Sequence, residues 1–157
     1  MNRVGWVAAA VAAAFGQAAW AVDKLPQQGT ASYVTYYSSR PLTTIDMGEL
    51  GAQALVEFVG ITRNTSGTKA FDNLSARCIF FRDNVGGKLK VSGSCTETDA
   101  DGDKVYSTFD SAAHTLVGGT GKYKGISGSA PYTVAPAPSP GQGLGAVVVD
   151  HKISWQF

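Results

Sequence analysis

The stretch Ala76–Thr98 reads ARCIFFRDNVGGKLKVSGSCTET and decides the fold class. Two runs of β-forming residues flank Gly86-Gly87, a pair that is typical of a two-residue hairpin turn. This turn places Cys78 directly opposite Cys95 at a non-hydrogen-bonded position, where Cα atoms are ~4.5 Å apart and a disulfide is accepted. Two interpretations remain open, a Cys78–Cys95 disulfide and a pair of buried free thiols. The register favours the disulfide.

The rest of the chain repeats this pattern of short β-like segments and tight turns. Further strands are predicted at Gly29–Tyr37, Gln53–Thr62, Lys104–Asp110, His114–Val117, Tyr132–Val134 and Ala146–Phe157. The segments 38–51 and 135–145 contain prolines and glycines and are expected to be loops. The whole chain has three glutamates and no convincing amphipathic helix, so it is all-β. Because closure hides sheet edges, we predict a small closed antiparallel β-barrel of about eight strands.

The first residues indicate export. Met1–Ala21 combines Arg3, an alanine-rich apolar run and the small-x-small sequence Ala19-Trp20-Ala21, as in a secretory signal peptide. Its removal leaves one barrel domain, residues 22–157, with a periplasmic or secreted location. The chain has thirteen Lys and Arg residues, including Arg3, and twelve Asp and Glu residues. Without a basic surplus, a nucleic-acid partner is not expected.

Two further motifs carry a resemblance. The run from Gly93 to Lys104 (GSCTETDADGDK) and Gly118–Gly128 (GGTGKYKGISG) together resemble small exported bacterial proteins without assigned activity. GGTGKY also resembles a turn of the allene oxide cyclase and dirigent barrels. This resemblance implies an eight-stranded barrel, often oligomeric, that binds an apolar or phenolic ligand in its lumen and steers the ligand's reaction by shape. Lipocalin-like barrels have the same general form. Only the turn is matched, so no catalytic residue is carried over.

The candidate ligand-binding residues come from the faces expected to meet the lumen. Strict alternation in Ala146–Phe157 places His151, Ile153 and Trp155 on the apolar face. His151 is either a ligand contact that can move a proton or a buried neutral histidine bonded to a backbone carbonyl.

Three other residues complete the candidate set. Glu57 interrupts apolar positions and is a potential partner for His151. Phe80 and Arg82 share the face of Cys78, and Arg82, like Glu97, is either a lumen group or a solvated rim group.

The motifs that imitate metal or phosphate sites have simpler explanations. Asp99–Asp103 (DADGD) has carboxylates that can share calcium, but its glycine spacing differs from an EF-hand, and a hairpin turn at Asp101-Gly102 is preferred. No helix follows the Gly119–Gly125 run, as a phosphate loop requires. We therefore predict no metal site and no cofactor.

Apolar residues also fall on the face opposite the cysteines. Ile79, Phe81, Val105 and Phe109 are assigned to that face. Such residues suggest a subunit interface or a covering loop, so a homo-oligomer is a candidate assembly.

Three functions remain open. The leading one is an exported barrel that binds a small apolar or aromatic ligand in its lumen without catalysis. The second is an isomerase or cyclase of the allene oxide cyclase kind, in which His151 or Glu57 assists the reaction. The third is a small outer-membrane β-barrel, suggested by the alternating strand that ends at Phe157.

Overall fold

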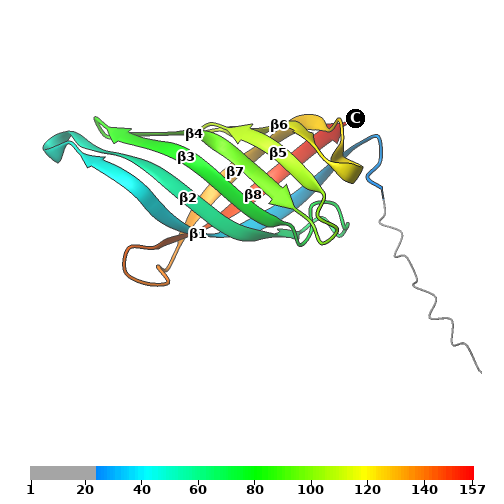
Figure 1. The fold of residues 1–157 in the computed structure, drawn as a ribbon, viewed down its shortest axis with the longest axis horizontal. Helices are drawn as coiled ribbons and strands as arrows, with labels where there is room; N and C mark the ends of the chain where they lie inside the picture. The colour runs from blue at the N-terminus through cyan, green and yellow to red at the C-terminus, as the bar shows by residue number, and fades with distance from the viewer. Residues whose placement is uncertain (1–23) are drawn as a thin grey trace, which may run out of the picture.

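The computed structural model describes residues 24–157, so the predicted leader, residues 1–21, lies outside the described part (Figure 1). Eight strands form a closed barrel in which each strand pairs with the next and β8 pairs with β1, all antiparallel. They are β1 Gln28–Asp46, β2 Gly51–Asn64, β3 Ser75–Val85, β4 Lys88–Thr98, β5 Lys104–Phe109, β6 Ala113–Gly119, β7 Ser127–Ala137 and β8 Gly145–Gln156. Two 3₁₀ turns, η1 Gly48–Leu50 and η2 Gly121–Tyr123, are the only helical elements among residues 24–157. The predicted fold class is confirmed.

The cysteine hairpin has the predicted register. Gly86 and Gly87 have φ values of 68° and 72°, as a type I′ turn requires. Cys78 lies opposite Cys95 and is bonded to it, with a Cα separation of 4.1 Å. Both cysteines are buried on the inner wall of the barrel. Residues at even spacing from Cys78 on β3 therefore face the lumen.

Two strands continue where loops were expected. β1 runs on to Asp46: Pro41 lies opposite Val56, and the register shift that follows leaves Leu42 without a partner on β2. A proline is tolerated at such a bulge, where its missing N–H breaks no ladder hydrogen bond. β7 likewise includes Pro136, which lies opposite Val147. The loop predictions for 38–51 and 135–145 are therefore wrong over most of the first segment and at the start of the second.

The second hairpin turn also differs from its prediction. A type I′ turn at Asp101-Gly102 would give both residues positive φ, but only Gly102 has one. β4 and β5 are joined instead by the five residues Asp99–Asp103. The side chain of Asp99 holds this loop by accepting hydrogen bonds from the backbone N–H groups of Asp101 and Asp103.

One end of the barrel is filled by a hydrophobic core. Its buried residues come from five strands and from the segments that cover this end: Ala31, Tyr33, Phe71, Leu74, Val105, Leu116, Tyr123, Ile126, Ala130, Ile153 and Trp155. The β2–β3 loop forms the main plug and is fastened by Thr62. The Thr62 hydroxyl donates to the Phe71 carbonyl at 2.7 Å and accepts from the Leu74 N–H at 2.8 Å.

The opposite end is left open. The β1–β2 and β3–β4 hairpins project beyond the shorter β5–β6 pair (Figure 1). The 138–144 loop, between β7 and β8, lies across the barrel from the β3–β4 hairpin. No helix among residues 24–157 is long and apolar enough to cross a membrane.

Candidate functional site

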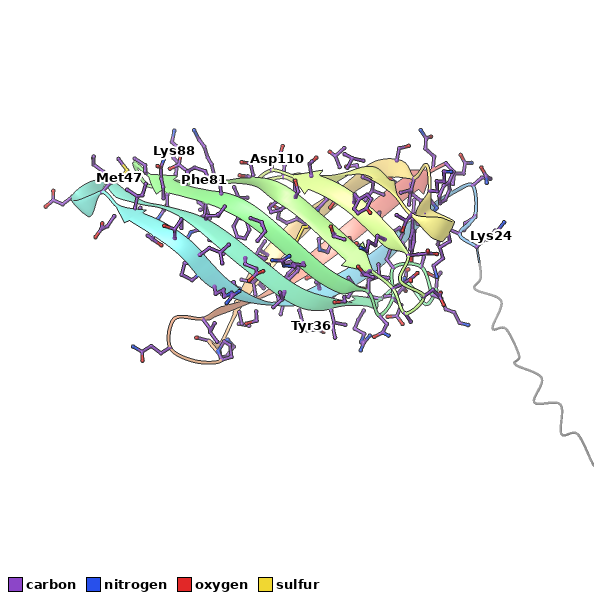
Figure 2. All side chains as sticks on the ribbon, in the orientation of Figure 1. Lys24, Tyr36, Met47, Phe81, Lys88 and Asp110 are labelled. Atoms are coloured by element: carbon purple, nitrogen blue, oxygen red, sulfur yellow. A yellow bond between two sulfur atoms is a disulfide. The ribbon has the colours of Figure 1, made fainter. Side chains whose placement is uncertain are left out.

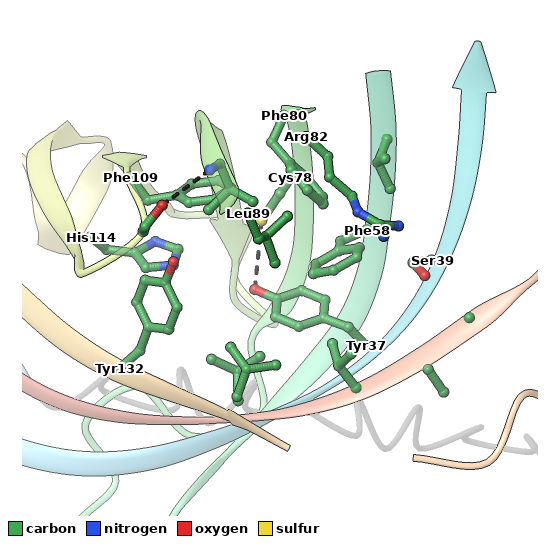
Figure 3. A pocket seen from close by; sticks show the side chains of 18 residues that line it. Tyr37, Ser39, Phe58, Cys78, Phe80, Arg82, Leu89, Phe109, His114 and Tyr132 are labelled. Carbon is green, nitrogen blue, oxygen red and sulfur yellow. Dashed lines mark hydrogen bonds between the residues drawn. The ribbon is translucent and has the colours of Figure 1, made fainter. Parts of the chain in front are cut away.

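The open half of the lumen is a cavity of about 520 Å³. Its size lies in the range of small-molecule sites, roughly 300–1,000 Å³. Aromatic and aliphatic side chains dominate its wall: Tyr37, Val56, Phe58, Phe80, Leu89, Val91, Phe109, Tyr132, Val134, Val147 and Val149 (Figure 3). All eight strands contribute lumen-facing positions to the wall because alternate residues of each strand point inward.

The aromatic rings form a continuous arc across neighbouring strands. Ring centroids are 5.0 Å apart for Tyr37 and Phe58, 4.6 Å for Phe58 and Phe80, and 5.6 Å for Phe80 and Phe109. These are the separations of tilted and edge-to-face aromatic pairs. The disulfide lies beneath the arc, where the Tyr37 hydroxyl is 3.6 Å from Cys78 Sγ.

His114 is the polar group of the cavity wall nearest the core. Its Nδ1 is hydrogen-bonded to Ser107 Oγ at 3.2 Å, and its Nε2 has no side-chain hydrogen bond within residues 24–157. The ring stacks on Phe109, with centroids 4.8 Å apart, and meets Tyr132 edge-on at 5.4 Å. Desolvation by burial lowers the pKa of His114 to about 4, so the imidazole is neutral at physiological pH.

His151 faces the lumen as predicted but does not line the cavity. It is 1% exposed and lies between Tyr33, whose ring stacks on it at 4.4 Å, and His114, at 5.1 Å. Burial, and then the neighbouring His114, lower the pKa of His151 to about 3. Neither ring nitrogen has a hydrogen-bond partner among the described residues, so the expected backbone-carbonyl bond is absent there.

Glu97 is a third buried titratable group of the lumen, beside His114 and His151. It is 3% exposed, and desolvation raises the pKa of its carboxyl group to about 7. The sequence left open whether Glu97 is a lumen or a rim group. Its inward, buried position between Ala76 and Val105 shows that it belongs to the lumen.

The other predicted site residues divide between the two halves. Phe80 and Arg82 line the cavity, Arg82 at its mouth. Ile153 and Trp155 face inward but belong to the core of the closed half, where Trp155 Nε1 donates to the Pro26 carbonyl at 3.1 Å. The expectation that they line the cavity is wrong, because the plug loop fills the lumen around them.

Glu57 lies on the outer wall, so the predicted pairing with His151 is wrong. Its two neighbours Val56 and Phe58 point into the cavity, which directs Glu57 outward. There its oxygens accept hydrogen bonds from Arg40 at 2.7 Å and Arg77 at 2.8 Å. The hydrogen bond from Arg77, followed by that from Arg40, lowers the pKa of Glu57.

Phe109, His114 and Tyr132 are cavity residues that the sequence did not single out. Their strands are short or carry prolines, so alternation alone did not show which side faces inward. Phe109 and Val105 were assigned to the outer face, and this is wrong: Val105 is 1% exposed in the core and Phe109 lines the cavity. Ile79 and Phe81 do face outward, and Figure 2 shows Phe81 on the outside of the barrel.

Two aspartates of the β4–β5 loop form salt bridges with the side chain of Lys122. Lys122 Nζ lies 2.7 Å from Asp99 and 3.0 Å from Asp101. Desolvation raises the pKa of Asp99, but hydrogen bonds from Lys122 and the backbone outweigh it, and the pKa is lowered. No cluster of metal-ligating side chains is present within residues 24–157.

Comparisons with known proteins add a structural likeness. No protein-family model and no curated protein sequence matches the chain. Among solved structures it is similar to the pterocarpan synthase dirigent protein GePTS1, with a TM-score of 0.43, 12% identity and coverage of 86% of this chain and 89% of that chain. The pterocarpan synthase dirigent protein PsPTS1 gives a TM-score of 0.41, 10% identity and coverage of 84% and 97%. The fold class rests on the strand topology of the barrel itself.

Proposed function

We propose that this chain is an exported barrel protein that binds one small apolar or aromatic molecule in the open half of its lumen, without catalysing a reaction. The observation that carries the proposal is the apolar cavity of about 520 Å³, which is open at one end and closed by the core at the other. A blind apolar cavity with few polar groups favours burial of an apolar body. The intact disulfide and the predicted leader support export.

The two residues that the cyclase hypothesis assigns to catalysis, His151 and Glu57, do not line the cavity. Glu57 is bound by two arginines on the outer wall, and His151 lies below the cavity with a lowered pKa. His114 does touch the cavity, but a base with a pKa of about 4 is poorly matched to proton transfer near neutral pH. These features support a binding protein over an enzyme.

The alternative of an outer-membrane barrel conflicts with the distribution of charge. Such barrels carry an apolar band outside and polar groups inside. Here the Arg40–Glu57–Arg77 group crosses three strands of the outer wall, and Asp150 and Lys152 are exposed on β8. The wall of the open half of the lumen, in contrast, is mainly apolar.

Binding is tested with N-phenyl-1-naphthylamine, a neutral aromatic molecule whose fluorescence rises in apolar surroundings. We expect saturable binding of one probe molecule per chain. Val147→Trp fills part of the cavity and should weaken this binding at least tenfold. Val148→Trp is the matched control, because Val148 is the next residue of β8 and faces outward between Tyr36 and Ala135.

Circular dichroism of both variants establishes that the barrel is retained. If Val147→Trp does not fold, Leu89→Trp replaces it, since Leu89 lines the mouth and is 58% exposed. Absence of saturable probe binding to the wild type, or equal binding by the cavity variant and its control, would overturn the proposal.

A further inference from the structure

The cavity wall carries one formal charge, and this charge lies at the mouth. Arg82 is the only Lys, Arg, Asp or Glu among the residues that line the cavity. It follows Phe80 on the same face of β3, two residues closer to the open end. Figure 3 shows its side chain at the edge of the cavity, with the guanidinium group on the side where Phe58 and Ser39 lie.

No acidic side chain of residues 24–157 forms an ion pair with Arg82. Of the arginines among residues 24–157, Arg40 and Arg77 share Glu57, and Arg63 donates to Asn73. Arg82 has neither an ion pair nor a side-chain hydrogen bond within the described chain. The N–H donors of the Arg82 guanidinium group are therefore available to a ligand. They lie next to an apolar wall that lowers the local dielectric constant.

The cavity wall below Arg82 favours a ligand with aromatic rings. Phe58 and Phe80 lie directly beneath it, and Tyr37 and Phe109 extend the same arc of aromatic side chains. A planar aromatic body gains offset or edge-on contacts with such rings in addition to burial of its surface. A ligand that satisfies both features has an aromatic body and one anionic substituent at the end nearest the mouth.

We propose that the lumen ligand is an aromatic monoanion, a carboxylate or sulfonate on a ring system, whose anionic group is bound by Arg82 while its rings pack against Phe58 and Phe80. This inference rests on the proposed function, because it specifies the ligand of the same cavity. Paired N–H···O bonds from guanidinium to a carboxylate or sulfonate are charge-assisted and geometrically specific. A neutral compound with the same rings makes the apolar contacts but lacks these bonds.

The test compares two compounds with one ring system, 1-naphthoate and 1-naphthalenemethanol, as competitors of N-phenyl-1-naphthylamine. We expect wild-type protein to bind the naphthoate roughly tenfold more tightly than the alcohol at low salt, with a smaller difference at high salt. Arg82→Gln should abolish the preference. Lys90→Gln is the matched control, because it removes a positive charge from the same hairpin on the outer face and should leave the preference unchanged.

Charge reversal gives an independent arm. Arg82→Glu should bind 1-naphthylmethylammonium more tightly than 1-naphthoate, the opposite of the wild type. Since Arg82 is exposed and unpaired, both substitutions should keep the fold. If the probe binds but the wild type shows no preference for the anion, or if Arg82→Gln retains the preference, this inference is wrong and the proposed function stands. If the probe does not bind, both are wrong.

Discussion

Position 121 of the GGTGKY turn requires a glycine. Gly121 has a φ of +50°, and a Cβ at this position would lie 1.7 Å from Asp103 Oδ1. The same carboxylate accepts a hydrogen bond from the Lys122 N–H at 3.0 Å. The glycine is thus required both by its backbone conformation and by the close approach of Asp103.

Gly121→Val should therefore destabilise the barrel by more than 1 kcal/mol, and Gly125→Val is the comparison. Gly125 also has a positive φ, +86°, but a Cβ there meets nothing within 4 Å. We expect the larger loss of unfolding free energy at Gly121, measured by urea denaturation. Equal losses at the two positions would show that Asp103 does not impose the glycine.

At the scale of the element, the β3–β4 hairpin contributes a disulfide to the inner wall of the barrel. Its disulfide is part of the inner wall, with both cysteines at most 4% exposed, and Cys78 lines the cavity. The hairpin therefore stiffens the wall that carries Phe80 and Arg82. A change in the crosslink acts on stability and on the cavity together.

Replacing both cysteines by alanine should cost about 3 kcal/mol of unfolding free energy, as the chain-entropy model gives for a loop of roughly this length. The crosslink spans a sequence separation of 17 residues. Urea unfolding of the wild type with and without reductant, beside the Cys78→Ala/Cys95→Ala variant, measures this contribution. Intact mass after alkylation is the second readout, and two reactive thiols in the native protein would contradict the crosslink.

For the whole molecule, buried titratable groups between the two halves make stability depend on pH in opposite directions. His114 and His151 have pKa values lowered to about 4 and about 3 by burial, from 6.5. The unfolded chain binds their protons first, so stability is lost as the pH falls below 6.5. Glu97 has a pKa raised from 4.5 to about 7, so its contribution is present below pH 4.5 and is lost as the pH rises through 7.

Below pH 6.5 the loss from the two histidines outweighs the gain from Glu97, so we expect the wild type to gain stability from pH 4 to about pH 6.5 and to change little from there to pH 8. Glu97→Gln should become more stable relative to the wild type as the pH rises from 4.5 to 8, by on the order of a few kcal/mol for a fully buried carboxyl group. His151→Phe, which can keep the stacking on Tyr33, should instead reduce the loss between pH 6.5 and pH 4. Urea midpoints across pH 4–8 test both, and a stability difference between Glu97→Gln and the wild type that does not change with pH would contradict the role of Glu97.

Local sequence patterns determined much of the fold. The Gly86-Gly87 turn set the pairing of Cys78 with Cys95, because a two-residue turn leaves one register for the flanking strands. Alternation in Ala146–Phe157 predicted the inward face of β8, since adjacent side chains of a strand point to opposite sides. Both properties depend on neighbours in sequence or on a single hairpin.

The division of the lumen into a core and a cavity was decided by tertiary structure. Trp155 and Ile153 lie in the core because Phe71 and Leu74, from a loop distant in sequence, enter the same end of the barrel. Glu57 faces outward because its strand is aligned by β1 and β3, which bring Arg40 and Arg77 to it. Inward faces follow a local period of two residues, but what fills the interior depends on segments that meet only when the sheet closes.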